Sequence, residues 1–252
     1  MRLGFYCVFL GASLGCSVEV EPEAAVSREA ARLHEFDVDF QNCTEFAGIG
    51  SVPKANAAPF VPAHYTLAGD ANNAVVVVRV ARCTRATVDG KETKETSVAQ
   101  VGVSLVGPDT SADINNYTVY LATDDEKLAN RLKRVGVDNE KLKEIGFKFN
   151  ANGALKIDVE PKHDPAYKVI GTAVAPTAAP TVFTASWWFD GDHGPVRMRT
   201  VFPAIRFGSS SMTLTTAPGC GLASLIGGTS LTFPFLDSYN AFPFAHMEVD
   251  TM

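Results

Sequence analysis

The segment of residues 181–207 constrains the fold of this chain more than any other part of its sequence. It reads TVFTASWWFDGDHGPVRMRTVFPAIRF, so two runs of aromatic and β-branched residues flank a turn-forming tip at residues 190–195. This arrangement is typical of a β-hairpin. Because side chains alternate along a strand, Trp187 and Trp188 should face opposite sides of a sheet, while Arg197 and Arg199 share one side. The segment therefore predicts the central hairpin of a curved antiparallel sheet.

Strand patterns recur along most of the remaining chain. Residues 36–42 alternate between apolar and polar side chains, and residues 74–80 form a nearly continuous apolar run. The first pattern predicts a half-buried strand and the second a strand buried on both faces. Further strands are predicted at residues 97–106, 115–122, 147–159 (a hairpin around residues 150–153), 167–174, 212–216, 230–236 and 244–249. No fixed repeat or linker interrupts them, so we predict a single domain at residues 35–252.

The predicted fold class is mainly β (α+β), with a large antiparallel sheet curled into a barrel or cone. One segment carries a clear helix signal. Thr123 precedes Glu126 by three residues, as in a capping box, and Leu128 and Leu132 follow at helical spacing. Gly136 suits the position after a helix end. We predict one well-formed helix at about residues 124–135 and only short helical turns elsewhere.

The charge distribution argues against nucleic acid as a partner. The formal net charge is −6, and the one concentration of lysines, at residues 127–143, is interleaved with acidic residues. Binding to phosphates needs clustered cations, whereas this pattern is typical of a solvated helix face. The sequence has no glycine-rich phosphate loop, HExxH or Gly-x-Ser-x-Gly motif, and its histidines are scattered. We therefore predict no cofactor and no metal site; the sequence carries no signal for the oligomeric state.

The N-terminus resembles an export signal. A short apolar stretch, residues 3–15, follows a basic start, and Cys16 comes after Ser-Leu-Gly as in a bacterial lipobox. Ser13 stands where the lipobox usually has leucine. We expect a signal peptide at residues 1–16 with lipidation of Cys16, and an acidic tether at residues 17–34. The protein would then lie in the cell envelope or outside the cell, touching a membrane only through its lipid. Plain secretion and a cytosolic location are the alternatives.

Export would allow disulfides to form. Outside the signal region three cysteines remain, Cys43, Cys83 and Cys220. Cys43 and Cys83 each lie in a predicted strand and are each followed by threonine. A Cys43–Cys83 bridge is one alternative, and three buried free thiols are the other. Cys220 has no obvious base nearby in the sequence, so we interpret it as a buried thiol.

A charge inside an apolar strand is the best pointer to a site. Arg79 lies within a run of valines, and a buried cation needs a partner or a solvated cavity. Glu45, on the parity of the polar positions 37, 39 and 41, is the nominated partner. We predict a concave ligand pocket lined by Glu45, Arg79, Trp187, Arg199 and His246. The alternatives are a structural ion pair, an arginine that reaches outward at a barrel rim, tryptophans that only pack the core, and a hydrogen-bonded core histidine.

Two segments carry a resemblance to a known family. Residues 61–65, VPAHY, are similar to a "VP-x-x-[YF]" step, and residues 116–120, NYTVY, lead into a helix and then a hairpin. Over roughly residues 36–250 this order resembles the acetoacetate decarboxylase-like superfamily. The resemblance implies a closed, barrel-like cone with a central cavity. It also implies a Schiff-base lysine, activated by an adjacent lysine, in a Gly-aromatic-Pro-Lys-Lys segment after the helix. The corresponding residues 136–143, GVDNEKLK, lack the lysine pair.

Three functions stay open from the sequence. The first is an exported, lipid-anchored β-barrel domain that binds a small, partly apolar carbonyl or carboxylate ligand in an interior cavity. The second is an acetoacetate decarboxylase-like enzyme, a lyase or a related activity. The third is an envelope structural or interaction lipoprotein without a ligand cavity.

Overall fold

The fold is seen in a computed structural model that describes residues 33–163, 165–233 and 238–252. The predicted signal peptide and Cys16 therefore lie outside the described residues, as does most of the predicted tether. Its last two residues, Leu33 and His34, begin a strand instead. None of the helices in the described ranges combines the length and the apolar composition that a membrane-spanning helix needs.

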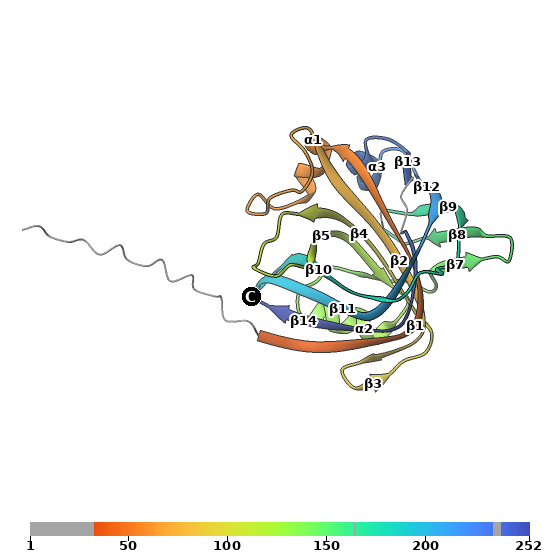
Figure 1. The fold of residues 1–252 in the computed structure, drawn as a ribbon. Helices are drawn as coiled ribbons and strands as arrows, with labels where there is room; N and C mark the ends of the chain where they lie inside the picture. The colour runs from red at the N-terminus through yellow and green to blue at the C-terminus, as the bar shows by residue number, and fades with distance from the viewer. Residues whose placement is uncertain (1–32, 164, 234–237) are drawn as a thin grey trace, which may run out of the picture. The chain divides into compact units, whose positions relative to one another are not determined.

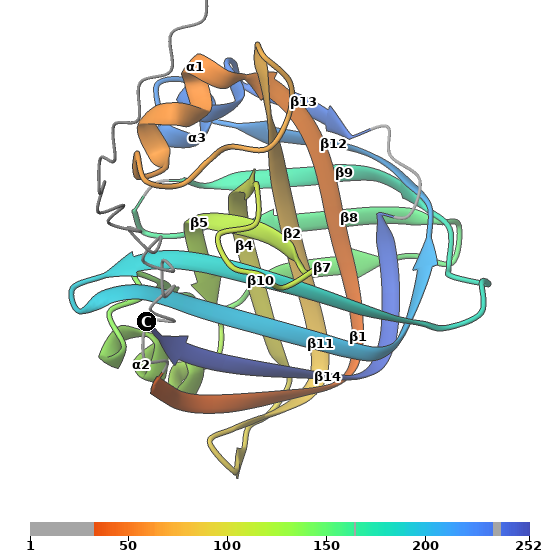
Figure 2. The same cartoon turned by 60° about the vertical axis from the view of Figure 1, so that its left-hand side comes forward.

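Seven strands close into a barrel (Figures 1 and 2). Around the ring they are β1 (Leu33–Pro53), β14 (Tyr239–Thr251), β11 (Gly194–Gly208), β10 (Thr181–Gly191), β5 (Ile114–Thr123), β4 (Thr96–Leu105) and β2 (Asn73–Val88), which pairs with β1 again. The predicted barrel is confirmed, with one correction: β5 and β10 are parallel, so the sheet is mixed. The chain between them forms a helix and most of a second sheet, the long crossover that a parallel pair needs.

A second sheet covers part of the outer barrel wall. Its five strands are all antiparallel, in the order β13 (Ser230–Phe233), β12 (Ser210–Thr216), β9 (Tyr167–Ala173), β8 (Ala154–Val159) and β7 (Gly146–Phe149). Ile157 and Leu214 of this sheet join one buried cluster with Val76 and Val78 of β2. The sequence predicts these strands but not that they form a separate sheet, because local patterns do not identify pairing partners.

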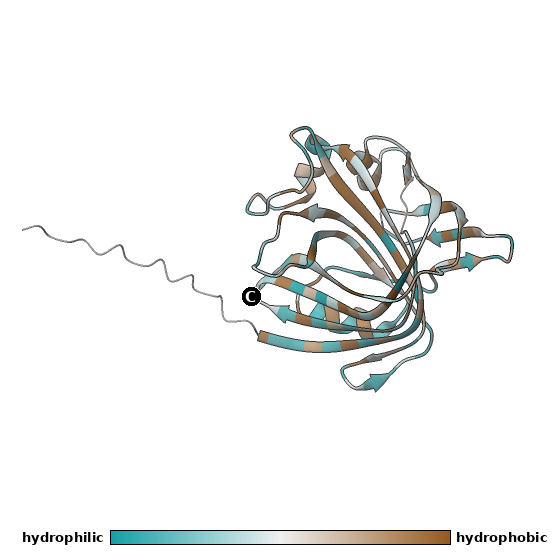
Figure 3. Ribbon diagram, viewed as in Figure 1, coloured by the Kyte–Doolittle hydropathy of each residue, from teal (hydrophilic) through white to brown (hydrophobic). Residues whose placement is uncertain are grey.

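The barrel interior holds a distinct apolar cluster. Since the second sheet packs on the outer wall, the opposite faces of the barrel strands point inward, and they contribute residues such as Val38, Val77 and Met198. Leu128 and Leu132 of α2 (Glu126–Arg134) pack against the same cluster. Figure 3 shows apolar and polar segments following one another along the barrel strands, the pattern of a wall with two different faces.

The predicted central hairpin is formed by β10 and β11. Trp187 pairs with Met198 in register, and the two tryptophans face opposite sides, as alternation requires. Trp187 belongs to the interior cluster, and Trp188 donates from Nε1 to Oδ1 of Asn115 at 2.7 Å. Gly102 of β4 makes room for Trp187, because an added Cβ would lie 2.6 Å from its ring.

The predicted long helix is present, but its cap is different. The sequence predicts that Thr123 caps the amide of Glu126; the structure shows Asp125 as the cap, accepting from the backbone N–H of Leu128 at 2.8 Å. Thr123 still belongs to β5, where its hydroxyl donates to the carbonyl of Ser97 at 2.8 Å. The helix therefore starts later than the capping-box pattern indicates, because strand pairing keeps Thr123 extended.

The remaining elements are short. They are α1 (Lys54–Ala57), a 3-10 turn (Ala58–Phe60), α3 (Gly221–Ile226), β3 (Lys91–Glu92), which extends the sheet beside β2, and β6 (Glu140–Lys141), which lies parallel to β5. α1 with its 3-10 extension and α3 are short helical turns of the kind that the sequence predicts outside the long helix.

One backbone position changes which side chains face the barrel interior. Asn42 in β1 has a positive φ of 49°, which interrupts the alternation of the strand. Before it Phe40 points inward, and after it Cys43 does. Glu45 therefore lies on the interior face, whereas Asp37 and Asp39 face outward. The parity that the sequence predicts for Glu45, shared with those two aspartates, is wrong for this reason.

Candidate functional site

Arg79 and Glu45 form a buried ion pair inside the barrel. Nε of Arg79 donates to Oε2 of Glu45 at 2.5 Å, and Nη1 donates to Oε1 of Gln100 at 2.9 Å. Oε1 of Glu45 accepts from Nδ2 of Asn240 at 3.4 Å. The guanidinium also lies 5.9 Å from the centre of the Phe202 ring. These contacts compensate the two charges within the protein, which is the arrangement of a structural ion pair.

The structure does not bring the five predicted ligand-binding residues together. Trp187 lies in the interior cluster, on the same side of the wall as Glu45 and Arg79. Arg199 and His246 lie on the outer face. Strand alternation is the physical reason, because the preceding and following residues of each, such as Met198 and Met247, point inward.

Arg199 and His246 have other partners on that outer face. Nε of Arg199 donates to Oδ2 of Asp113 at 2.8 Å. Nδ1 of His246 lies 2.7 Å from Oδ1 of Asp39, and its side chain is 35% exposed. The interpretation of His246 as a core histidine is therefore wrong, and a shared pocket with Glu45 and Arg79 is not formed.

The structure describes three cysteines, Cys43, Cys83 and Cys220. Cys43 and Cys83 face each other across β1 and β2 and form a disulfide. Cys220 is a buried free thiol; its Sγ accepts from the backbone N–H of Ala223 at the start of α3. Among the residues that the structure describes, no group of three or more His, Cys, Asp or Glu side chains could hold a metal ion.

A pocket of about 490 Å³ lies where the second sheet meets the barrel wall. It is lined from the barrel by Ala99 and residues 119–122, from the second sheet by Val159 and Tyr167, and from α2 by Lys133. Residues 138–141, which include β6, and Pro161, Lys162, His163 and Pro165 after β8 complete the lining. None of the five predicted ligand-binding residues is among them.

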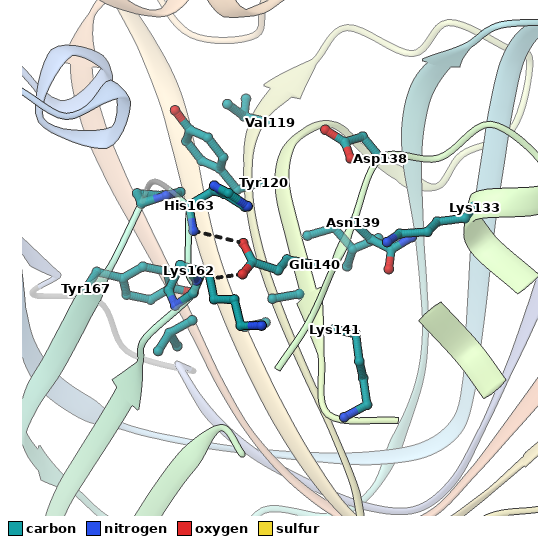
Figure 4. Close-up of a pocket in the computed structure, with 16 residues that line it drawn as sticks. Val119, Tyr120, Lys133, Asp138, Asn139, Glu140, Lys141, Lys162, His163 and Tyr167 are labelled. Atoms are coloured by element: carbon teal, nitrogen blue, oxygen red, sulfur yellow. Dashed lines mark hydrogen bonds between the residues drawn. The ribbon is translucent and has the colours of Figure 1, made fainter. Parts of the chain in front are cut away.

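Glu140 joins two borders of this pocket. Its carboxylate accepts from the backbone N–H of Lys162 at 2.5 Å and of His163 at 3.4 Å, as Figure 4 shows. It therefore holds the segment after β8 against the segment after α2. With Lys133, Lys141 and Lys162 against Asp138 and Glu140, the lining has more cations than carboxylates, which favours an anionic ligand.

Two buried polar atoms on the pocket lining have no partner among the described residues. One is Oδ1 of Asn139, whose Nδ2 donates to the carbonyls of Ala129 at 3.2 Å and Val137 at 3.0 Å. The other is the hydroxyl of Tyr167, whose pKa is raised by burial. In Figure 4 they lie on opposite sides of the pocket. Buried polar groups are normally hydrogen-bonded, so such atoms mark positions where a ligand or water can bind.

Tyr167 also lines a second pocket of about 410 Å³, together with Glu160, Lys168 and residues 215–217. Tyr167 is thus common to the linings of both pockets. The first pocket is the better candidate site, because it combines several charged groups with the two unpartnered atoms.

Comparison with known proteins gives a fold but no sequence relative. No protein-family model matches the sequence, and no curated protein matches it. Acetoacetate decarboxylase from Legionella pneumophila is similar in structure, with a TM-score of 0.52, 13% identity, and coverage of 85% of this chain and 87% of that one. The enduracididine biosynthesis enzyme MppR complexed with pyruvate is also similar, with a TM-score of 0.52, 12% identity, and coverage of 95% and 96%.

The chain has the acetoacetate decarboxylase-like fold. The resemblance seen in the sequence is therefore confirmed at the level of fold. Residues 138–141, which belong to the segment 136–143 that the resemblance singles out, line the pocket.

Sequence reasoning points to part of this pocket and misses the rest. The resemblance singles out residues 136–143, but Tyr167 is interpreted only as the start of a strand. A tyrosine that opens a strand is common and carries no local sign of an unused hydroxyl. Only the tertiary structure shows that this hydroxyl is buried without a partner among the described residues, in a side chain that lines the pocket with β5 and residues 138–141.

Proposed function

We propose that this chain is an acetoacetate decarboxylase-like enzyme that acts on a small carbonyl compound bearing a carboxylate. One observation carries the proposal: the larger of the two pockets lies against the segment in which that family's decarboxylases place their reactive amine. The excess of lysines over carboxylates on its lining supports an anionic substrate. The pyruvate complex of MppR, which has the same fold, supports an oxo acid as the substrate class.

Lys141 is the nominated amine. Asn139 and Glu140 cannot form a Schiff base, whereas Lys141 follows them directly and lines the pocket. In the proposed reaction the unprotonated amine attacks the substrate carbonyl, and water leaves to give an iminium ion. For a 3-oxo acid, the electron pair of the bond to the carboxylate then moves toward the iminium nitrogen and carbon dioxide leaves. The enamine takes up a proton, and water releases the ketone and the free lysine.

Borohydride trapping tests this proposal. The protein is incubated with acetoacetate or pyruvate and sodium borohydride, and the adduct is measured by intact mass and located by peptide mapping. We expect one reduced adduct on Lys141, lost in Lys141→Met. Lys143→Met is the matched control, since Lys143 belongs to the same segment but does not line the pocket. The absence of any adduct, or an adduct on another lysine, would contradict the nomination of Lys141.

A second candidate function is binding of the same compounds without a covalent step. It is favoured by the position of the Lys141 amine, which donates to the carbonyl of Leu142 and leads away from Glu140 in Figure 4. In this case pyruvate should bind with a dissociation constant measurable by calorimetry, and no adduct should form. A protein that binds neither acetoacetate nor pyruvate would support the envelope structural or interaction alternative.

We also propose that the chain is exported and anchored by a lipid on Cys16. The lipobox-like start of the sequence and the Cys43–Cys83 disulfide, which suits an oxidising compartment, support this. The mature protein should begin at Cys16 and carry a diacylglycerol, as intact mass can show. A mature chain that begins elsewhere without a lipid would rule the anchor out.

A further inference from the structure

Tyr167, which lines the pocket, has a buried hydroxyl whose hydrogen-bonding capacity is unused among the described residues. Its side chain is 4% exposed, and its hydroxyl has no hydrogen-bond partner among the residues described by the structure. It occupies the first position of β9, paired with Val159 on one side and Thr216 on the other. Burying a hydroxyl without a partner destabilises a folded protein, so such a group marks a position where a ligand or water can bind.

The surroundings of Tyr167 define what its hydroxyl can bind. Burial disfavours the phenolate, so the group stays protonated near neutral pH and can donate a hydrogen bond. Lys162 lines the same pocket, and in Figure 4 it lies on the same side as Tyr167. A neutral donor and an ammonium group on the same side of one pocket suit a carboxylate, because hydrogen bonds to charged acceptors are the stronger ones.

We propose that Tyr167 determines the specificity of this pocket by donating a hydrogen bond from its hydroxyl to a carboxylate oxygen of the ligand. The ligand class is a small monocarboxylate, either an oxo acid or its hydroxy counterpart. This inference rests on the proposed function for the place of the ligand, but it does not require a Schiff base. A 2-hydroxy acid has no carbonyl to react with an amine and should still bind through its carboxylate.

The test compares Tyr167→Phe with the wild-type protein. The variant keeps the ring and removes only the hydroxyl. Binding of pyruvate and of lactate is measured by calorimetry, and stability by urea unfolding. Tyr239→Phe is the matched control, because Tyr239 is another buried tyrosine and lines neither pocket.

We expect Tyr167→Phe to weaken binding of both compounds about 10-fold or more, the loss typical of a hydrogen bond to a charged group. We also expect its unfolding midpoint to stay the same or rise, since an unsatisfied buried hydroxyl has been removed. The control should bind both compounds as the wild-type protein does. Unchanged affinity in Tyr167→Phe, or a wild-type protein that does not bind lactate, would overturn the inference.

These outcomes separate the inference from the proposed enzyme. A trapped adduct on Lys141 together with unchanged affinity in Tyr167→Phe supports the enzyme and rejects the role of Tyr167. No adduct together with weakened lactate binding rejects the enzyme and supports Tyr167. If the variant does not fold, the wild-type protein with ¹³C-labelled tyrosine is titrated with lactate. The Cζ resonance of Tyr167 is assigned with a chain in which only the segment around Tyr167 is labelled. We expect this resonance to shift when lactate is added, and an unshifted resonance would count against the inference.

Discussion

At the scale of single residues, two arginines are buried in the described part of the chain, and each has carboxylate partners. Arg79 pairs with Glu45 inside the barrel, and Arg197 contacts Asp109 at 2.7 Å and Asp250 at 3.3 Å on the outer face. Arg79 is held from two sides by Glu45 and Gln100. Burying the two charges of such an ion pair removes them from water, which offsets much of their mutual attraction. Removing one partner therefore lowers the stability of the protein by more than the net contribution of the pair, because the other charge stays buried.

Arg79→Met should therefore destabilise the protein by about 3 kcal/mol, because it leaves the buried carboxylate of Glu45 without its cation. Urea unfolding at neutral pH measures this. Arg79→Met combined with Glu45→Gln should recover part of the loss. Arg85→Met is the control: Arg85 pairs with Glu92 at the surface, and its loss should cost under about 1 kcal/mol. Equal losses in Arg79→Met and Arg85→Met would mean that the interior pair contributes no more than a surface pair.

At the scale of elements, the segment between β4 and β5 is fastened to β11 by two ion pairs. Arg197 contacts Asp109 at 2.7 Å, and Arg199 contacts Asp113 at 2.8 Å. Burial alone would raise the pKa of Asp109, but hydrogen bonds from Ser111 and Arg197 outweigh it and lower the pKa. The pKa of Asp113 is lowered in the same way, mainly by Arg199.

The lowered pKa values predict how stability changes in acid. A carboxyl group whose pKa is lower in the folded than in the unfolded protein stabilises the fold at pH values above its unfolded-state pKa. This contribution is lost as the pH falls through the pKa of the folded state. The protein should therefore lose stability below about pH 4, near the ordinary aspartate value of 3.8. Urea midpoints at pH 5 and pH 3 measure this. The double variant Asp109→Asn, Asp113→Asn should be less stable than the wild-type protein at pH 5, and its urea midpoint should fall less between pH 5 and pH 3. An equal fall in both proteins would contradict the assignment of the acid sensitivity to these two aspartates.

At the scale of the whole molecule, β1 is central to the barrel, because it pairs with the next strand of the chain, β2, on one side and with the last strand, β14, on the other. β1 is the longest strand and contacts both of them along most of its length. The Cys43–Cys83 disulfide lies within the β1–β2 pairing and joins two residues that are 40 positions apart in the sequence. It therefore ties together the two strands that close the ring.

Removing this disulfide should lower the stability of the folded chain by about 2–4 kcal/mol, the usual range for a loop of this size. Cys43→Ala combined with Cys83→Ala can be compared with the wild-type protein by thermal unfolding with and without reductant. Reductant should lower the wild-type midpoint and leave the double variant unchanged. A wild-type protein that is insensitive to reductant under unfolding conditions would show that the bridge does not contribute.

Local sequence patterns determine much of the secondary structure of this protein, whereas its tertiary structure decides the site. The hairpin of β10 and β11, the turn at residues 150–153 and the helix α2 follow from alternation, turn residues and helical spacing, all of which act over a few neighbours. The Glu45–Arg79 pair is also foreseen, because a cation in an apolar strand needs a partner. The separate second sheet, the inward turn of Glu45 after Asn42, and the pocket around Tyr167 are not. They depend on which distant strands pair and pack, and a one-residue change of parity moves every later side chain to the other face.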